Sequence, residues 1–282
     1  MKASGFRRHG AALKAAALSL FIACCAQGGA LAEEASATGL AAWFEGFKKD
    51  FNKTFIVGQR WKRMFLVGLG NTMKITVLAL LLGLVIGTII AAIRSTYDKT
   101  ADSARPTVGR RLFGLLNGFC KVYLTVLRGT PVMVQLMIIV FVIFKYSDNG
   151  VMLASLAFGL NSGAYVAEII RGGIMSIDNG QFEAGRSLGF NYIQTMRYVV
   201  LPQVIKNVLP ALMNEFIALL KETSVAGYAA VHDLTYGANT VSSATYNYFF
   251  PLISVALIYL ALVMFFTWIV GKVERRLRAS DH

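Results

Sequence analysis

Long stretches without a single charged residue constrain this chain more than any other feature of its sequence. The stretches Ile75–Ile93 and Tyr248–Val270 contain no Asp, Glu, Lys or Arg. A helix needs about 20 consecutive apolar residues to cross the hydrocarbon core of a bilayer. Of the 282 residues, 56% are hydrophobic and only 15% are charged, a balance that soluble domains of this size do not have. The sequence therefore predicts an all-α integral membrane protein.

Three further apolar stretches are interrupted by polar residues: Val122–Phe144, Val151–Ile170 and Ile205–Leu220. In the first, Arg128–Pro131 is expected to break or kink the helix, because Pro lacks a backbone donor and Gly129 tolerates a bend. The last stretch is shorter and more polar than free exposure to lipid would allow, so we expect protein to surround it. The chain is thus predicted to cross the membrane five times.

The segments between these stretches are predicted to be loops. Arg94–Arg111 is basic and polar, and Lys99 within it has no predicted partner. Lys221–Asn247 is a connector rich in Gly, Ser, Thr and Tyr. Inside the first apolar stretch, the spacing of Gly83 and Gly87 would let another helix approach closely.

Residues 1–32 are predicted to be a secretory signal peptide. Basic residues precede the apolar run Ala15–Ala26, and Ala30–Ala32 supplies a small-x-small cleavage site. An uncleaved anchor and a lipoprotein-type cleavage before Cys24 are the alternatives.

Residues 33–62 are predicted to form a polar, amphipathic segment. Four aromatic residues recur in it at helical spacing, which favours a helix lying on the membrane surface. A partly ordered linker is the alternative. The four residues are Trp43, Phe44, Phe47 and Phe51.

A polar island follows the third apolar stretch. Asp178 and Gln181 have the spacing of a capping box, and Gly189 is suited to a left-handed helix end, so residues 179–188 should form a short helix. A second N-cap is expected at Asn191, starting a helix that Pro202 kinks or restarts. On the short helix, Phe182, Gly185 and Leu188 fall on one face, whereas Glu183 and Arg186 are neighbours on another.

The island carries a spaced motif. Glu183–Gly185 is followed after three residues by Gly189, after nine more by Val199, and then by Leu201–Pro202. This pattern resembles the signature loop of permease subunits of ATP-binding-cassette (ABC) importers. Gly185 and Val199 depart from the Ala and Ile of the family pattern. The resemblance implies a cytoplasmic loop that couples to an ATPase, and an ordinary cytoplasmic loop is the alternative.

Other segments resemble permeases for polar amino acids, and the glutamine and histidine type is the nearest likeness. The resemblance covers about Phe55 to Arg276 and implies a five-helix type I importer permease domain at residues 63–276, with a cytoplasmic tail at 277–282. The segments are Leu127–Pro131, Gln135–Leu136, Gly163–Ile174, Gln194–Tyr198, Leu201–Gln203, Asn214–Phe216 and Leu220–Ser224.

The resemblance also implies partners and a location. The expected partners are two ABC ATPase subunits that hold ATP and Mg, a second copy or a paralogous permease, and a periplasmic or tethered amino-acid-binding protein. The chain itself is expected to bind no cofactor. The chain is expected to lie in the bacterial inner membrane and to cross it several times. Its expected substrate is a polar amino acid.

Basic residues favour one orientation. With the signature loop inside, the three cytoplasmic segments carry six, four and four Lys and Arg, whereas the loops after the second and fourth stretches carry one each, Lys145 and Lys221. This satisfies the positive-inside rule. The segment before the first stretch is an exception, with seven basic residues on the predicted outside. An outside mature N-terminus and a cytoplasmic C-terminus follow.

Two groups of candidate site residues result. Arg128 could meet the carboxylate of a substrate and Glu168 its ammonium, because unpaired charges inside apolar stretches are costly; pairing within the protein is the alternative. Glu215, Lys221 and Glu222 could line an outer gate, although for the last two a solvated pair is an alternative. The ATPase-coupling group is Phe182, Glu183, Ala184, Gly185, Leu188 and Gly189, and the substrate-pathway group is Arg128, Gly129, Thr130, Pro131, Gln135, Glu168, Glu215, Lys221 and Glu222.

Other functions lack support in the sequence. The chain has no phosphate-binding loop and no cluster of Cys and His, so ATP hydrolysis must come from a partner, and no metal site is predicted. The net charge of +13 is explained by basic loops beside anionic lipid rather than by nucleic acid. A stand-alone channel or an ion-coupled carrier is the alternative function, and it leaves the signature loop unexplained.

Overall fold

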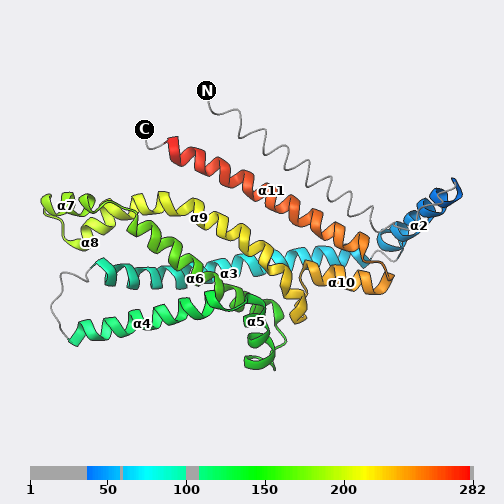
Figure 1. Cartoon of the computed structure of the whole chain (residues 1–282), viewed down its shortest axis with the longest axis horizontal. Helices are drawn as coiled ribbons and strands as arrows, with labels where there is room; N and C mark the ends of the chain where they lie inside the picture. Colours follow the sequence, from blue (N-terminus) through cyan, green and yellow to red (C-terminus); the bar gives the residue numbers. More distant parts are fainter. Residues whose placement is uncertain (1–36, 58–59, 100–107, 280–282) are drawn as a thin grey trace. The chain divides into compact units, whose positions relative to one another are not determined.

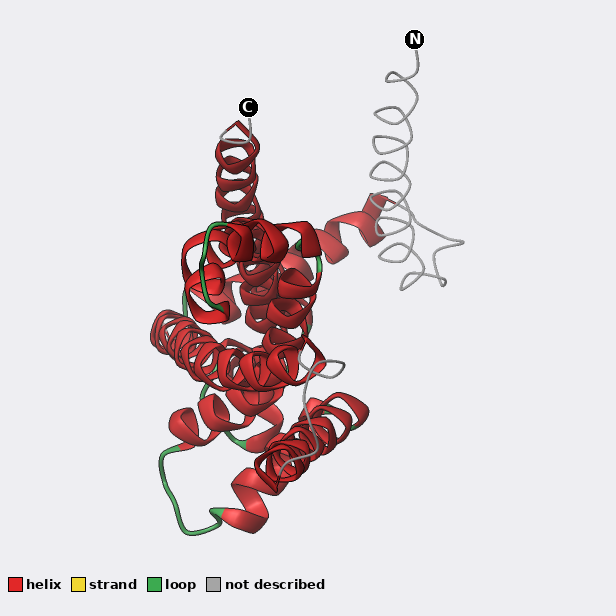
Figure 2. Cartoon of the chain, turned by 90° about the vertical axis from the view of Figure 1, so that its left-hand side faces the viewer, coloured by secondary structure: helices red, strands yellow, loops and turns green. Residues whose placement is uncertain are grey.

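The structure is a computed structural model that describes residues 37–57, 60–99 and 108–279 (Figure 1). Over these ranges it consists of helices joined by short connections and contains no strand (Figure 2). The predicted signal peptide and the end of the predicted tail lie outside the described residues. The helices are α2 (Ala37–Phe55), α3 (Arg60–Lys99), α4 (Val108–Gly129), α5 (Val132–Met137), η1 (Ile138–Ile143), α6 (Gly150–Met175), α7 (Asn179–Ser187), α8 (Tyr192–Thr195), η2 (Met196–Val200), α9 (Leu201–Glu222), η3 (Thr223–Ala229), α10 (Leu234–Thr245) and α11 (Phe249–Ala279).

The chain divides into two units, Met1–Lys53 and Thr54–His282. In the first, α2 forms where the aromatic spacing predicts a helix. The Trp43 ring stacks on the Phe47 ring with centroids 5.5 Å apart, and both side chains are exposed. The helix is therefore present, and its placement on a membrane surface stays a prediction.

The core of the second unit is the pairing of α3 with α6, which is the most extensive helix contact in it. Small residues let the two backbones approach. A Cβ added to Gly87 would lie 2.5 Å from Cγ1 of Val166, and one added to Gly83 would lie 3.2 Å from the Ser162 side chain. The close approach predicted from this glycine spacing is confirmed. Ile75, Ala79 and Phe158 are fully buried where the helices meet.

Three of the described helices are long and apolar enough to cross a membrane: Phe65–Lys99, Gly150–Met175 and Phe249–Leu277. A fourth crossing is possible if α4 and the α5–η1 segment, which meet at a bend of 104°, count as one broken span. This bend lies at the predicted break. Helix α9 does not meet the same criterion, and it packs against α6 and α11.

Two predicted loops are largely helical. Helix α3 continues through Arg94 to Lys99, because ion pairs to α6 stabilise its polar last turns: Arg94 lies 2.6 Å from Glu168, and Asp98 lies 3.4 Å from Arg171. Helix α4 begins at Val108, so the described residues of the predicted loop, 94–99 and 108–111, are helical.

The predicted connector Lys221–Asn247 contains η3 and α10. Asp233 caps α10 by accepting a hydrogen bond from the Tyr236 amide at 2.7 Å. The same segment is fastened to α3, because the Leu234 amide donates to Oγ1 of Thr72 and the Asn71 side chain donates to the His232 carbonyl. Burial raises the pKa of the Asp233 carboxyl to about 6, against the lowering effect of its hydrogen bonds. These hydrogen bonds explain why the connector is helical. They cannot be inferred from its amino-acid composition.

Candidate functional site

Helix α7 is the short helix predicted in the polar island. Asp178 precedes it and accepts a hydrogen bond from the Gly180 amide at 2.7 Å. The Gln181 side chain accepts from Nε2 of Gln203 at 3.2 Å, whereas the predicted capping box has it bonded back to Asp178. Asp178 therefore caps α7 as predicted, but the predicted capping box with Gln181 is not formed.

Gly189 ends α7 in the way that the sequence predicts. Its φ is +80°, a left-handed conformation that glycine adopts without steric cost. The Gly189 amide donates to the Arg186 carbonyl, and the Phe190 amide donates to the Gly185 carbonyl at 3.0 Å. These two bonds turn the chain from α7 towards α8.

Helices α7 and α8 form one packed hairpin. Gly185 is buried against Thr195, whose Oγ1 would lie 2.5 Å from a Cβ at position 185. The rings of Phe182 and Tyr192 stack with centroids 6.0 Å apart and planes 14° from parallel. Leu188, predicted on the same face, is 73% exposed, because the helix is already ending at that residue and its backbone departs from helical geometry.

Helix α8 leads without interruption into α9. Asn191 and Gln194 form the predicted cap as a full capping box, with both reciprocal hydrogen bonds at 2.9 Å. The π-helix η2 follows at Met196–Val200, and Pro202 lies in the first turn of α9. The helix therefore changes from π to α geometry at Leu201, next to Pro202, without a break.

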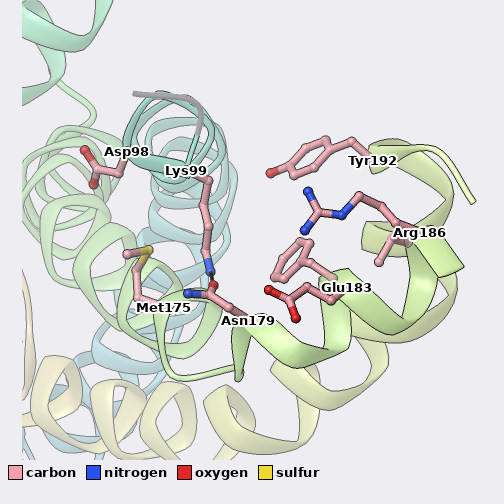
Figure 3. Close-up of a pocket in the computed structure, with 9 residues that line it drawn as sticks. Asp98, Lys99, Met175, Asn179, Glu183, Arg186 and Tyr192 are labelled. Atoms are coloured by element: carbon pink, nitrogen blue, oxygen red, sulfur yellow. Dashed lines mark hydrogen bonds between the residues drawn. The ribbon is translucent and has the colours of Figure 1, made fainter. Parts of the chain in front are cut away.

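The outer side of the hairpin is polar and accessible. Glu183, Ala184 and Arg186 are exposed, together with Leu188. A pocket of about 460 Å³ lies between this hairpin and the ends of α3 and α6 (Figure 3). It is lined by Asp98, Lys99, Met175, Asn179, Phe182, Glu183, Arg186, Tyr192 and Thr195.

The break between α4 and α5 is supported by side-chain amides. Nε2 of Gln135 lies within hydrogen-bond distance of the Leu127 carbonyl (2.9 Å), the Thr130 carbonyl (3.0 Å) and the Thr130 hydroxyl (2.8 Å). Asn161 of α6 donates to the same Leu127 carbonyl and to Oε1 of Gln135, both at 3.0 Å. A break inside a membrane must have its freed carbonyls satisfied by protein. Gln135, a predicted pathway residue, is buried and supplies that support.

Glu168 joins three helices. It lies 2.6 Å from Arg94 of α3, 3.5 Å from Arg171 one turn along α6, and 3.9 Å from Arg128 of α4. Glu168 therefore forms ion pairs within the protein, which was the alternative to a contact with the substrate. Arg128 is more loosely held: its side chain is 44% exposed, and its guanidinium lies 5.5 Å from the centre of the Tyr165 ring.

The other predicted pathway residues lie either at the break between α4 and α5 or on α9. Gly129, Thr130 and Pro131 are exposed at the break beside Arg128. Glu215 lies on α9, half-buried, and accepts a hydrogen bond from the Ser162 hydroxyl of α6 at 2.8 Å. Lys221 and Glu222 are exposed at the end of α9.

Sequence reasoning missed Asn161 and assigned Arg94 to a loop. A signal for Asn161 exists, because an amide inside an apolar stretch needs a partner. Its partner, the carbonyl of Leu127, is set only by the fold.

The fold and this site define a subunit of a membrane transport system. The model of the family described as "Binding-protein-dependent transport system inner membrane component" matches residues 106–279. The chain therefore belongs to this family.

Individual relatives are named as amino-acid permeases. The chain is 39% identical over 220 residues to the arginine transport system permease protein ArtQ of Bacillus subtilis, covering 77% of this chain and 93% of that protein. It is 40% identical over 184 residues to a putative glutamine transport system permease protein GlnP of Rickettsia bellii, covering 60% and 84%.

Solved structures give the same result for the fold. A crystal structure of an amino acid ABC transporter with histidines matches with a TM-score of 0.66 and 38% identity, over 77% of this chain and 95% of that one. The inward-facing MetNI methionine ABC transporter matches with a TM-score of 0.63 at 17% identity, over 77% of this chain and 97% of that one, and shows the fold alone.

Replacing Gln135 by Met should destabilise the protein, because the carbonyls at the break lose their shared donor. We expect a loss of about 1 to 3 kcal/mol in the free energy of unfolding, measured by thermal unfolding of the purified protein in detergent. Val134→Met, at an exposed neighbouring position on α5, should change stability by less than about 0.5 kcal/mol. Equal stability of the two variants would contradict the supporting role of Gln135.

Proposed function

We propose that this chain is the membrane-spanning subunit of an importer for a polar amino acid, driven by ATP hydrolysis in partner subunits. The observation that carries the proposal is α7, a capped polar helix that ends at the left-handed Gly189 and exposes Glu183. The relatives named for arginine and glutamine transport support the substrate class. A stand-alone channel or an ion-coupled carrier has no use for such a helix.

The proposed assembly contains more than this chain. A second copy or a paralogous permease would complete the membrane part, and two ATPase subunits would hold ATP and Mg. A periplasmic or tethered binding protein would deliver the amino acid. The role of this chain is to conduct the substrate rather than to catalyse a reaction.

Helix α7 is the proposed contact with the ATPase. Glu183 is the central residue of α7, and its exposed carboxylate can accept charge-assisted hydrogen bonds from a partner. A push on α7 would pass to α8 through the packing of Gly185 on Thr195 and of Phe182 on Tyr192. Since α8 continues into α9, the movement would reach the membrane-embedded helices.

The substrate would pass the break in the α4–α5 helix. Arg128 is the proposed contact for the substrate carboxylate, because it is half-exposed and its ion pair to Glu168 is long. Glu168 is the proposed contact for the ammonium group, in competition with its tight pair to Arg94. Glu215, which accepts a hydrogen bond from Ser162 of α6, is proposed to line the path farther along.

The proposed orientation places α7 in the cytoplasm. Basic residues gather in the segments on that side, as the positive-inside rule requires. The mature N-terminus and α10 would then lie outside, and the end of α11 would lie inside.

Variants of α7 test the coupling role. Glu183→Ala should weaken binding of the ATPase about 10- to 100-fold, the usual worth of one charge-assisted hydrogen bond. Gly189→Val should strain the left-handed turn by about 1 to 2 kcal/mol and misplace α7. Both variants should insert at normal levels and lose most amino-acid uptake. Uptake and co-purified ATPase are measured at equal membrane levels.

Two variants serve as matched controls. Glu274→Ala removes an acidic side chain on α11, at the same predicted side of the membrane, and Gly189→Asn keeps a residue that tolerates the left-handed conformation. Both should transport almost normally. If Glu183→Ala and Gly189→Val assemble and transport as well as these controls, α7 is not the coupling element.

Arg128→Gln should raise the KM for the amino acid about 10- to 100-fold and leave the amount of protein in the membrane unchanged. The reason is that a contact with the substrate carboxylate is lost, whereas Glu168 keeps Arg94 and Arg171. Arg111→Gln, exposed near the start of the same helix, should have an unchanged KM. A KM for Arg128→Gln that equals that of the control would remove Arg128 from the substrate path.

Cysteine labelling tests the orientation. In a chain whose three native cysteines are replaced by serine, a cysteine at Ser243 should react with an impermeant reagent added to intact cells. A cysteine at Ser280 should react only after the cells are opened. Reaction of both positions from outside would show that the proposed orientation is wrong.

A further inference from the structure

Lys99 is predicted to lie in a loop without a partner, but it is the last residue of α3 and contacts α7. Its Nζ lies 2.9 Å from Oδ1 of Asn179, the first residue of α7. The same Nζ lies 4.6 Å from the centre of the Phe182 ring, one turn farther along α7. Figure 3 shows the Lys99 and Asn179 side chains pointing towards one another at the edge of the pocket.

Phe182 also connects α7 to α8, because its ring stacks on the Tyr192 ring. The contact of Lys99 with Phe182 therefore bears on both helices of the hairpin. Phe182 is held between these two contacts, with the Lys99 ammonium and the Tyr192 ring each beside it.

The end of α3 is itself fixed to α6. Asp98, next to Lys99, pairs with Arg171 at 3.4 Å, and Arg94 pairs with Glu168 at 2.6 Å. An ammonium group is also favourable at the C-terminus of a helix, where the dipole is negative. Lys99 thus extends from a rigid point rather than from a free helix end.

Along the chain the hairpin is linked at both ends, because residues 176–178 connect α7 to α6 and α8 continues through η2 into α9. The contact of Lys99 adds a third helix, α3, which is not next to the hairpin in the chain. A contact from a third direction restricts how α7 can turn relative to α3 and α6. We propose that Lys99 is a positioning residue for coupling, which fixes the direction of α7 relative to α3 and α6. The proposal rests on the coupling role of α7 proposed above.

The test measures how many amino-acid molecules are transported for each ATP hydrolysed, in the complete transporter reconstituted with its ATPase and binding protein. In Lys99→Met the ATPase should still co-purify and the KM for the amino acid should be unchanged. The transport per ATP should fall about tenfold, the lower end of the worth of a hydrogen bond to a charged group. Lys99→Arg should restore most of it, because a guanidinium can make both contacts.

A matched control and a double variant separate positioning from general damage. Lys272→Met removes an ammonium that lies 3.6 Å from the centre of the Trp268 ring on α11, away from α7 in sequence, and should leave transport per ATP unchanged. Asn179→Ala should lower the ratio as Lys99→Met does, but less. The double variant should be no worse than Lys99→Met alone, since both changes remove the same contact.

Normal transport per ATP in Lys99→Met, or additive losses in the double variant, would overturn the proposal. If Lys99→Met fails to accumulate, Asn179→Ala and its combination with Lys99→Arg give the same comparison from the other side of the contact. The outcome for Glu183→Ala shows whether the coupling role of α7 or only the role of Lys99 is wrong. A normal Glu183→Ala refutes the coupling role of α7 itself, whereas a defective Glu183→Ala beside a normal Lys99→Met refutes only the role of Lys99.

Discussion

Hydrogen bonding of backbone carbonyls inside an apolar environment is the constraint on which this structure depends. A break such as that between α4 and α5 frees carbonyl groups where lipid offers no donor. The side chains of Gln135 and Asn161 supply donors to the Leu127 and Thr130 carbonyls, so a sharp bend can exist there. Because the bend is held in this way, Arg128 emerges beside it half-exposed instead of being directed along a continuous helix.

Ion pairs between α3 and α6 add to the close backbone packing of these two helices at the glycines of α3. The glycine contacts of α3 bring the two helices together, and the pairs Arg94–Glu168 and Asp98–Arg171 extend their contact beyond the apolar part. The result is a rigid pair whose end lies beside the α7–α8 hairpin. The part of the molecule that would meet an energy source and the part that would meet the substrate are therefore built on the same two helices.

Features with a local cause could be predicted from the sequence. The apolar stretches, the break at Arg128–Pro131 and the helix ending at Gly189 each follow from residues that act within one or two turns. Features with a distant cause could not. The last turns of α3 are polar and become helical only because α6 supplies their partners, and Lys99 gains its role from α7, 80 residues away. The same holds for α10, whose order depends on hydrogen bonds with α3 at Leu234 and at the preceding His232.

The π-helix η2 has a geometric consequence for the path. Each residue of an α-helix advances the side-chain direction by about 100°, and a π turn accommodates one residue more than an α turn does. The π turn at Met196–Val200 therefore takes up one extra residue with nearly the rotation of an α turn. If the same residues were α-helical instead, every side chain of α9 would be turned by about 100° relative to the hairpin, and Glu215 would no longer face Ser162. The five residues of η2 thus set the helical phase between the hairpin and Glu215 of α9.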